Sequence, residues 1–128
     1  RVKAVWDPAN HIQDPDGDDL PPYPDGYEII RNDIVHDHVK DAVVEADGNR
    51  PNVFLGMGRA DWDRQFRALL DDGYDGYVSL ETHVNPDRFP KDLEERYGRY
   101  LVGDGREGRE ASSKVCLAWI RDRMAELA

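Results

Sequence analysis

Three short apolar segments constrain the fold of this chain more than any other feature. They lie at residues 2–6 (VKAVW), 33–39 (DIVHDHV) and 76–80 (GYVSL), and each has the length and composition of a buried strand. Turn-forming residues follow each segment, and a stretch with helical spacing of apolar residues comes next. Repeated strand-helix units of this kind predict an α/β fold built on a parallel sheet.

Loops and a short helix are predicted between the first and second apolar segments and after the second. Residues 7–26 are too rich in Pro, Gly and Asp for regular structure, so we expect a long loop of the kind that borders a site. Residues 27–33 (YEIIRND) predict a short helix. Residues 41–58 predict a second long loop, with a small β-segment at 52–55 (NVFL).

The rest of the chain predicts helices. Asp61 is placed to cap a helix that Gly73 would end, and the apolar residues of this helix recur at helical spacing at Trp62, Phe66, Leu69 and Leu70. C-terminal helices are expected from about residue 87, with one beginning near 90 and a strong closing helix over 109–128. Residues 102–108 (VGDGREG) predict a flexible connection between these two helices.

Composition bounds the class of protein. A chain of 128 residues with 39% hydrophobic and 34% charged content predicts one domain, over residues 1–128. A formal net charge of -10 repels phosphate backbones and anionic lipids, so neither a nucleic acid nor a membrane is expected as a partner. No apolar run approaches the roughly 20 residues that span a bilayer. Cys116 is the single cysteine, which excludes an internal disulfide and favours a reducing, cytoplasmic location, and its neighbours predict the core face of a helix.

A polar residue with metal-binding chemistry stands at or near the end of each predicted strand. These residues are Asp7, His38 and Glu81. Because parallel strands end at one edge of a sheet or barrel, where such folds place their ligands, the three side chains are expected to converge. A mixed set of nitrogen and oxygen ligands suits Mn²⁺, Mg²⁺, Zn²⁺ or Co²⁺. The spacing therefore predicts a site for one divalent cation.

Neighbouring polar residues receive different interpretations. Side chains alternate along a strand, so His36 and Lys40 share the face of His38 and are expected to line the same pocket, although His36 can also serve as an interior hydrogen-bonding group. Asp37 points to the opposite, helix-facing side and needs an Arg or backbone partner there. His83 lies in a loop, which favours a solvated side chain. The LGMG sequence at 55–58 lacks the third glycine of a dinucleotide-binding fingerprint, so we discard that interpretation.

Three motifs in order resemble the xylose isomerase-like family of TIM barrels, which are sugar phosphate isomerases and epimerases. They are DPANH at 7–11, HDHVKD at 36–41 and the segment from LGMG to ETH at 55–83. The family also includes hydroxypyruvate isomerase, inosose dehydratase and, more distantly, endonuclease IV. The resemblance implies that the predicted strands are the last three of a (β/α)₈ barrel. The chain would then be the C-terminal portion of such a barrel, about three strands plus helices.

The resemblance also implies a cofactor and a mechanism. The family binds one divalent cation through Glu, Asp, His and a second Glu, and the last three match Asp7, His38 and Glu81. The first Glu would precede residue 1. In the isomerases and epimerases the two glutamates move a proton on the substrate carbon while the metal steadies an enediolate, which makes Glu81 a catalytic acid/base group.

Departures from the family pattern bear on the substrate. Many ketose epimerases carry a substrate-binding His three residues after the metal Asp, where this chain has Asn10 with His11 next. They also carry an Arg six residues after the metal His, where this chain has Val44. These differences argue against ketose 3-epimerase specificity and leave the broader class. Asn10 and His11 remain candidate contacts to a sugar or sugar-phosphate substrate. Lys40 would contact a carboxylate or phosphate group, or extend to solvent.

Chain length leaves several functions open. A full barrel needs about 250 residues, so this chain holds about half of one and is expected to associate with the rest of the barrel or to form a homo-oligomer. The leading function is a metal-dependent isomerase or epimerase, incomplete as this chain alone. A non-catalytic subunit that binds metal or sugar is the alternative. A phosphoesterase of the endonuclease IV type is disfavoured by four His and the acidic charge.

Overall fold

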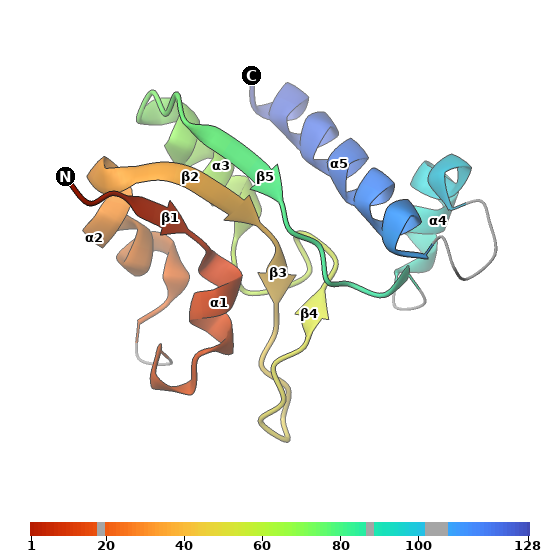
Figure 1. Ribbon diagram of the computed structural model, residues 1–128. Coiled ribbons are helices and arrows are strands. Elements are labelled where there is room, and N and C mark those ends of the chain that lie inside the picture. The colour runs from red at the N-terminus through yellow and green to blue at the C-terminus, as the bar shows by residue number, and fades with distance from the viewer. Residues whose placement is uncertain (18–19, 87–88, 102–107) are drawn as a thin grey trace.

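A three-stranded parallel sheet lies at the centre of the described structure (Figure 1). The computed structural model describes residues 1–17, 20–86, 89–101 and 108–128. The sheet has the order β1-β2-β5, with β1 over Ala4–Trp6, β2 over Ile34–Val39 and β5 over Tyr77–Leu80. The three apolar segments thus form the strands predicted for them, and the parallel α/β fold class is confirmed.

The register of the strands determines which side chains share a face. Val5 lies opposite His36, which lies opposite Tyr77, and His38 lies opposite Ser79. The pairing of β1 with β2 is irregular between Ala4 and Val5. As a result the alternating polar residues of β2 stand in one row with the polar residues of β5.

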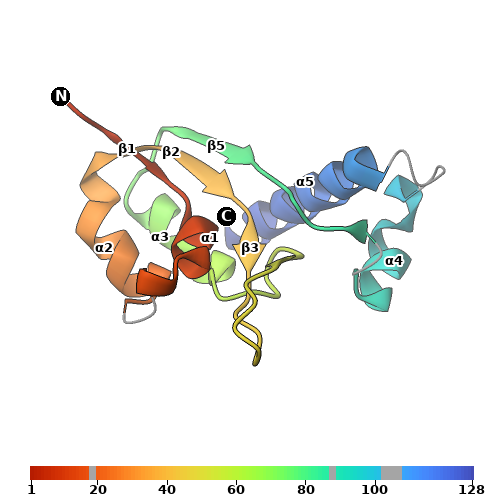
Figure 2. The ribbon, with the colours of Figure 1, turned by 60° about the horizontal axis from the view of Figure 1, so that its bottom comes forward.

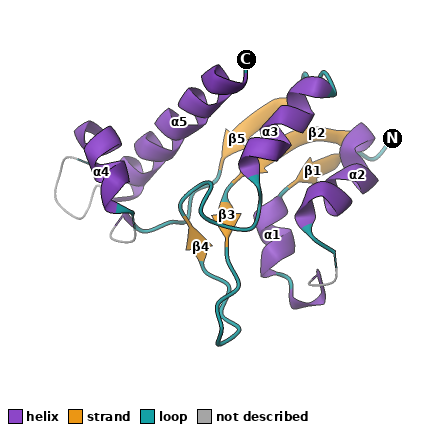
Figure 3. Cartoon of the chain, turned by 180° about the vertical axis from the view of Figure 1, so that it is seen from behind, coloured by secondary structure: helices purple, strands orange, loops and turns teal. Residues whose placement is uncertain are grey.

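Helices cover one face of the sheet and leave the other open (Figures 2 and 3). The covering layer contains α1 (Pro8–Gln13), α2 (Tyr27–Ile30) and α3 (Trp62–Asp71), and α5 (Gly108–Leu127) continues it beside α3. On the open face Val5 is 57% exposed and Tyr77 80% exposed. Within the described ranges, no helix shields these two side chains.

The core lies between the sheet and the helices. Trp62 and Phe66 of α3 are buried, and the Phe66 ring lies 6.4 Å from that of Trp119 on α5. Trp6 is also buried, and its indole Nε1–H donates a 2.7 Å hydrogen bond to Gln65 Oε1, which fixes β1 to α3. Cys116 of α5 is buried, as its sequence context predicted.

The prediction of an irregular loop over residues 7–26 is wrong at its beginning, where α1 forms. The Asp7 carboxylate accepts a 3.0 Å hydrogen bond from the Asn10 backbone N–H, which caps the helix, and Pro8 occupies its first position. Ala9 and Ile12 are buried, so one side of this short helix joins the core. In the rest of this segment the structure describes short helical turns at Pro15–Gly17 and Pro22–Gly26, and residues 18–19 lie outside the described ranges.

A small antiparallel hairpin interrupts the second predicted loop. It pairs β3 (Asp41–Ala42) with β4 (Asn52–Val53), so the β-segment expected at 52–55 is confirmed in part. After this hairpin, the prediction that the Asp61 side chain caps α3 is wrong. The residue has a left-handed backbone (φ 56°), and its carboxylate instead accepts a 3.2 Å hydrogen bond from Arg64. Gly73 ends the helix with a φ of 66°, as expected.

The C-terminal helices follow the prediction. They are α4 (Lys91–Tyr97) and α5, and further short 3₁₀ turns lie at Arg31–Asp33 and Gly98–Tyr100. Most of the connection predicted at 102–108 lies outside the described residues. None of the described helices has the length and apolar character that crossing a membrane requires.

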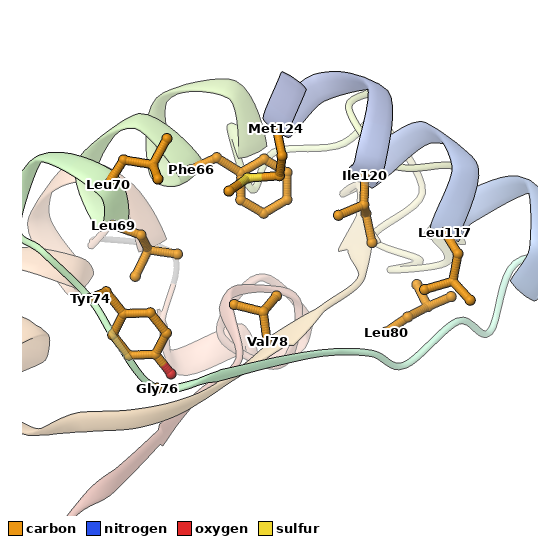
Figure 4. Close-up of a pocket in the computed structure, with 10 residues that line it drawn as sticks. All are labelled: Phe66, Leu69, Leu70, Tyr74, Gly76, Val78, Leu80, Leu117, Ile120 and Met124. Carbon is orange, nitrogen blue, oxygen red and sulfur yellow. The ribbon is translucent and has the colours of Figure 1, made fainter. Parts of the chain in front are cut away.

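An apolar cavity of about 300 Å³ separates α3 from α5 above β5 (Figure 4). Leu69 borders it from α3, Val78 from β5 and Ile120 from α5. Leu70, one of the apolar residues at helical spacing in α3, also borders it and is 43% exposed. The two helices and the last strand therefore leave an apolar space between them.

Candidate metal centre

The structure brings Asp7, His38 and Glu81 together at the carboxyl ends of the strands. Asp7 directly follows β1, His38 is the fifth residue of β2 and Glu81 directly follows β5. One ligand atom from each residue lies within 4.8 Å of the others. His38 Nδ1 is 3.1 Å from Glu81 Oε2 and 3.7 Å from Asp7 Oδ2. The convergence expected from strand geometry is thus present.

Backbone hydrogen bonds hold two of the three residues in place. The Asp7 carboxylate uses Oδ1 to cap α1, which directs Oδ2 toward His38. The Glu81 backbone N–H donates a 3.1 Å bond to the Val39 carbonyl and so extends the β2-β5 pairing by one residue. Both carboxylates are therefore positioned by the ends of secondary-structure elements.

The state of Asp7 Oδ2 fits a cation site. The atom is buried, and no hydrogen bond of good geometry reaches it from the described residues. Its nearest charged neighbour is the Lys40 ammonium, with an Nζ to Oδ2 distance of 3.1 Å, so the contact is electrostatic without an aligned N–H donor. A buried carboxylate oxygen without a donor requires a positive charge beside it, which the Lys40 ammonium supplies and which a metal ion would also supply.

Lys40 joins the group in a way that the sequence did not predict. Its Nζ lies 3.1 Å from Asp7 Oδ2 and 3.1 Å from Glu81 Oε2, and its side chain is only 6% exposed. The alternative in which Lys40 extends to solvent is therefore wrong. The Lys40 ammonium pairs with the two carboxylates of the site itself.

Glu81 is held as a carboxylate by the groups around it. The hydrogen bond with His83 and then the one from Lys40 lower its pKa. His83 is exposed, as expected for a loop residue, but its Nε2 lies 3.2 Å from Glu81 Oε1. Sequence reasoning missed this contact, although the spacing of two residues after Glu81 was a signal for it.

His36 lies next to the group on the open face. Its Nε2 shares a 2.6 Å hydrogen bond with Ser79 Oγ, and its ring is edge-on to that of His38 with 5.0 Å between centroids. The ring thus forms the hydrogen bond within the protein that one interpretation of His36 predicted, and its contact with a substrate stays a prediction. The partner oxygen on Ser79 comes from the matching register position of β5.

The structure does not bring Asn10 and His11 into this group. The contact that Asn10 makes with Asp7 comes from its backbone N–H, and the residue is exposed. His11 Nε2 forms a hydrogen bond with the Leu20 carbonyl, and its ring centroid is 6.4 Å from that of Trp6. Trp6 faces the helical layer, so the His11 ring lies on the opposite side of the sheet from His38. Substrate contacts from Asn10 and His11 remain predictions.

Asp37 lies on the helix-facing side, as expected, but the described residues do not supply the predicted partner. Its side chain is fully buried, and neither carboxylate oxygen has a hydrogen-bond partner in the described part of the chain. Burial, with a smaller contribution from the Asp7 charge, raises the pKa of Asp37 to about 7. The residue therefore carries a destabilising charge near neutral pH.

Asp41 has a structural role that the sequence analysis missed. Its Oδ1 accepts backbone N–H groups of Ala42 and Ala60 at 2.9 and 3.1 Å, and its Oδ2 accepts those of Gly56 and Gly58 at 3.0 Å each. A Cβ on Gly58 would lie 2.0 Å from Asp41 Oδ1, which explains the glycine. Burial raises the pKa of Asp41 to about 6, although the four N–H donors act in the opposite direction. The LGMG loop is thus shaped around a carboxylate of the protein.

A parallel βα sheet with Asp, His and Glu converging at the carboxyl edge of its strands defines an α/β protein with a candidate cation site. The family model described as "Xylose isomerase-like TIM barrel" matches residues 1–98, and the chain belongs to this family. The family includes isomerases and epimerases as well as endonuclease IV-like enzymes. Searches among curated proteins and among solved structures found no match.

Proposed function

We propose that this protein acts in a metal-dependent isomerase or epimerase of sugars or sugar phosphates. The observation that carries the proposal is the convergence of Asp7, His38 and Glu81, with ligand atoms within 4.8 Å of one another. Two carboxylate oxygens and one imidazole nitrogen would hold one divalent cation, Mn²⁺, Mg²⁺, Zn²⁺ or Co²⁺. Such a cation, when bound, would polarise the carbonyl group of a substrate.

Glu81 is the residue proposed to move the proton. Its side chain is 39% exposed, more than the 9% of Asp7, so it is the carboxylate of the site that a substrate reaches from the open face. Its lowered pKa keeps it ionised at neutral pH and therefore able to accept a proton from a substrate carbon. His36 and Lys40 border the same face and are proposed to contact the substrate.

Metal binding is tested with Asp7→Ala and His38→Ala. We expect the wild-type protein to bind one Mn²⁺ per site and each variant to bind at least about tenfold more weakly, because each loses a ligand. Asp47→Ala and His11→Ala are matched controls, since Asp47 lies in an exposed turn and His11 on the helical side. Undiminished Mn²⁺ binding in both site variants would refute the proposed centre.

Catalysis is tested separately from metal binding, because a non-catalytic metal- or sugar-binding subunit is the second candidate. The observation that favours this candidate is the open face of the sheet, on which Val5 is 57% exposed and Tyr77 80% exposed. Exchange of a sugar C–H for deuterium in D₂O, followed by NMR, distinguishes the two. A catalyst shows exchange that is lost in Glu81→Gln, whereas a binding subunit shows none in either protein.

The proposed activity requires a covering for the open face. A (β/α)₈ barrel has eight strands, and the described residues contribute three to this sheet. In the described part of the chain no further strand pairs with the outer edges of β1 and β5, and open edges favour pairing with further strands. We propose that further βα units cover this face, either from a second copy of the chain or from the rest of a barrel. Light scattering after size exclusion tests for self-association, and a monomer would leave only the second source.

A further inference from the structure

The two oxygens of the Glu81 carboxylate have different neighbours. Oε2 lies 3.1 Å from His38 Nδ1 and 3.1 Å from Lys40 Nζ, so it is the oxygen that faces the candidate metal centre. Oε1 lies 3.2 Å from His83 Nε2 and forms a hydrogen bond with it. Because a carboxylate only accepts hydrogen bonds, the His83 Nε2–H is the donor. One oxygen is thus directed toward the other candidate ligands, and His83 holds the second.

The residue between Glu81 and His83 explains why these two side chains meet. Thr82 Oγ1 lies 3.4 Å from Ser112 Oγ and 3.8 Å from Cys116 Sγ, and both of these α5 residues are buried. The Thr82 side chain is therefore directed toward α5. Successive side chains of a segment that continues a strand point to opposite sides, so Glu81 and His83 both point away from α5. The packing of Thr82 on α5 thus sets the side on which His83 meets Glu81.

Glu81 needs this second contact because its side chain is otherwise free to turn. A glutamate side chain has several rotatable bonds, and that of Glu81 is 39% exposed. The two oxygens of a carboxylate have the same chemistry, so an unrestrained Glu81 would offer either of them, or both, to an ion. Carboxylates that bind metals are in turn hydrogen-bonded, and these outer contacts fix the orientation in which they bind.

We infer that His83 is a positioning residue that holds Glu81 Oε1, so that Glu81 binds a divalent cation through Oε2 alone. The inference rests on the proposed function, which assigns the cation to Asp7, His38 and Glu81. His83 does not belong to the group of described residues whose ligand atoms converge, and its side chain is 55% exposed. Its role is therefore to fix a ligand of the metal centre without bonding the ion itself.

The inference is tested by titrating Co²⁺ into wild-type protein, His83→Ala and His83→Gln, with Asn49→Ala as the matched control. Glutamine keeps an N–H donor at about the reach of the histidine Nε2. Asn49 Nδ2 donates a 2.7 Å hydrogen bond to Asp47 Oδ2 in an exposed turn, so the control removes a donor from a carboxylate two residues earlier, as His83→Ala does. Co²⁺ absorbs visible light more weakly as its coordination number rises, and this absorption is the readout.

We expect the absorption per bound Co²⁺ to fall at least about twofold in His83→Ala, because the released Oε1 joins Oε2 on the ion. His83→Gln and Asn49→Ala should match the wild type. A His83→Ala spectrum equal to that of the wild type, or a His83→Gln spectrum equal to that of His83→Ala, overturns the inference and leaves the proposed metal centre standing. Absence of bound Co²⁺ from all four proteins ends both. Because His83 is exposed, its replacement should leave the circular dichroism spectrum unchanged.

Discussion

The buried Asp37 carboxylate makes a sharp prediction about the pH dependence of stability. Asp37 is fully buried on the helix-facing side of β2, and no described residue donates a hydrogen bond to it. Desolvation is the main cause that raises its pKa to about 7, and the charge of Asp7 adds to it. In the unfolded chain the same carboxyl titrates at about 3.9.

The sign and size of the effect follow from these two pKa values. Between about pH 4 and pH 7 the unfolded chain has released this proton while the folded protein retains it, so the free energy of unfolding falls as pH rises. The slope is about 1.4 kcal/mol per pH unit, and the total loss above pH 7 is roughly 4 kcal/mol. Asp37→Asn removes the titrating group, so this loss should be absent from the variant.

Urea unfolding of both proteins at several pH values between 4 and 8, followed by circular dichroism, measures the effect. The stability of Asp37→Asn relative to wild type should rise by roughly 4 kcal/mol across this range. Asp33→Asn is a control, since a hydrogen bond from Lys3 lowers the pKa of Asp33, so the stability that this carboxylate contributes is already present above about pH 4 and this variant should show no comparable change between pH 4 and 8. Parallel curves for wild type and Asp37→Asn would refute the argument that Asp37 is buried without a partner.

Three further predictions concern stability and are measured by the same urea assay at pH 7. Asp41→Ala leaves four backbone N–H groups without an acceptor and should lower the free energy of unfolding by about 3 kcal/mol. The control Asp47→Ala, in an exposed turn, should change the free energy of unfolding by less than about 1 kcal/mol. Gly58→Ala should destabilise by at least about 2 kcal/mol, because the added Cβ overlaps Asp41 Oδ1, and a neutral effect would show that the loop relaxes freely. Trp6→Phe removes the 2.7 Å bond to buried Gln65 and should lower the free energy of unfolding by about 1 to 3 kcal/mol. A decrease no larger than the lost packing of the indole ring explains would count against that bond.

The miss at α1 shows how composition misleads when local signals are present. The Pro and Asp content of residues 7–26 predicted a loop, yet Asp7 followed by Pro8 is a helix start that could have been recognised. The same carboxylate caps α1 through Oδ1 and faces the candidate metal site through Oδ2. Asp7 therefore has two roles, and the sequence analysis recognised the one at the metal site but not the helix cap.

The sequence by itself determined the strands, their parallel order and the meeting of Asp7, His38 and Glu81. Alternation of side chains and the common edge of parallel strands are local rules, so residues at matching positions converge whatever the details of packing. These rules say nothing about which charges are close enough to pair or how much water reaches them.

Only the tertiary structure decided the partners of Lys40, Asp37 and Asp41. Lys40 and Glu81 are separated by 41 residues, yet their charged atoms lie 3.1 Å apart. Asp41 is surrounded by N–H donors from a loop up to 19 residues away, while Asp37, four residues before it, has none among the described residues. Distance and burial fix the energy of a charge, and both arise only when separate segments pack together.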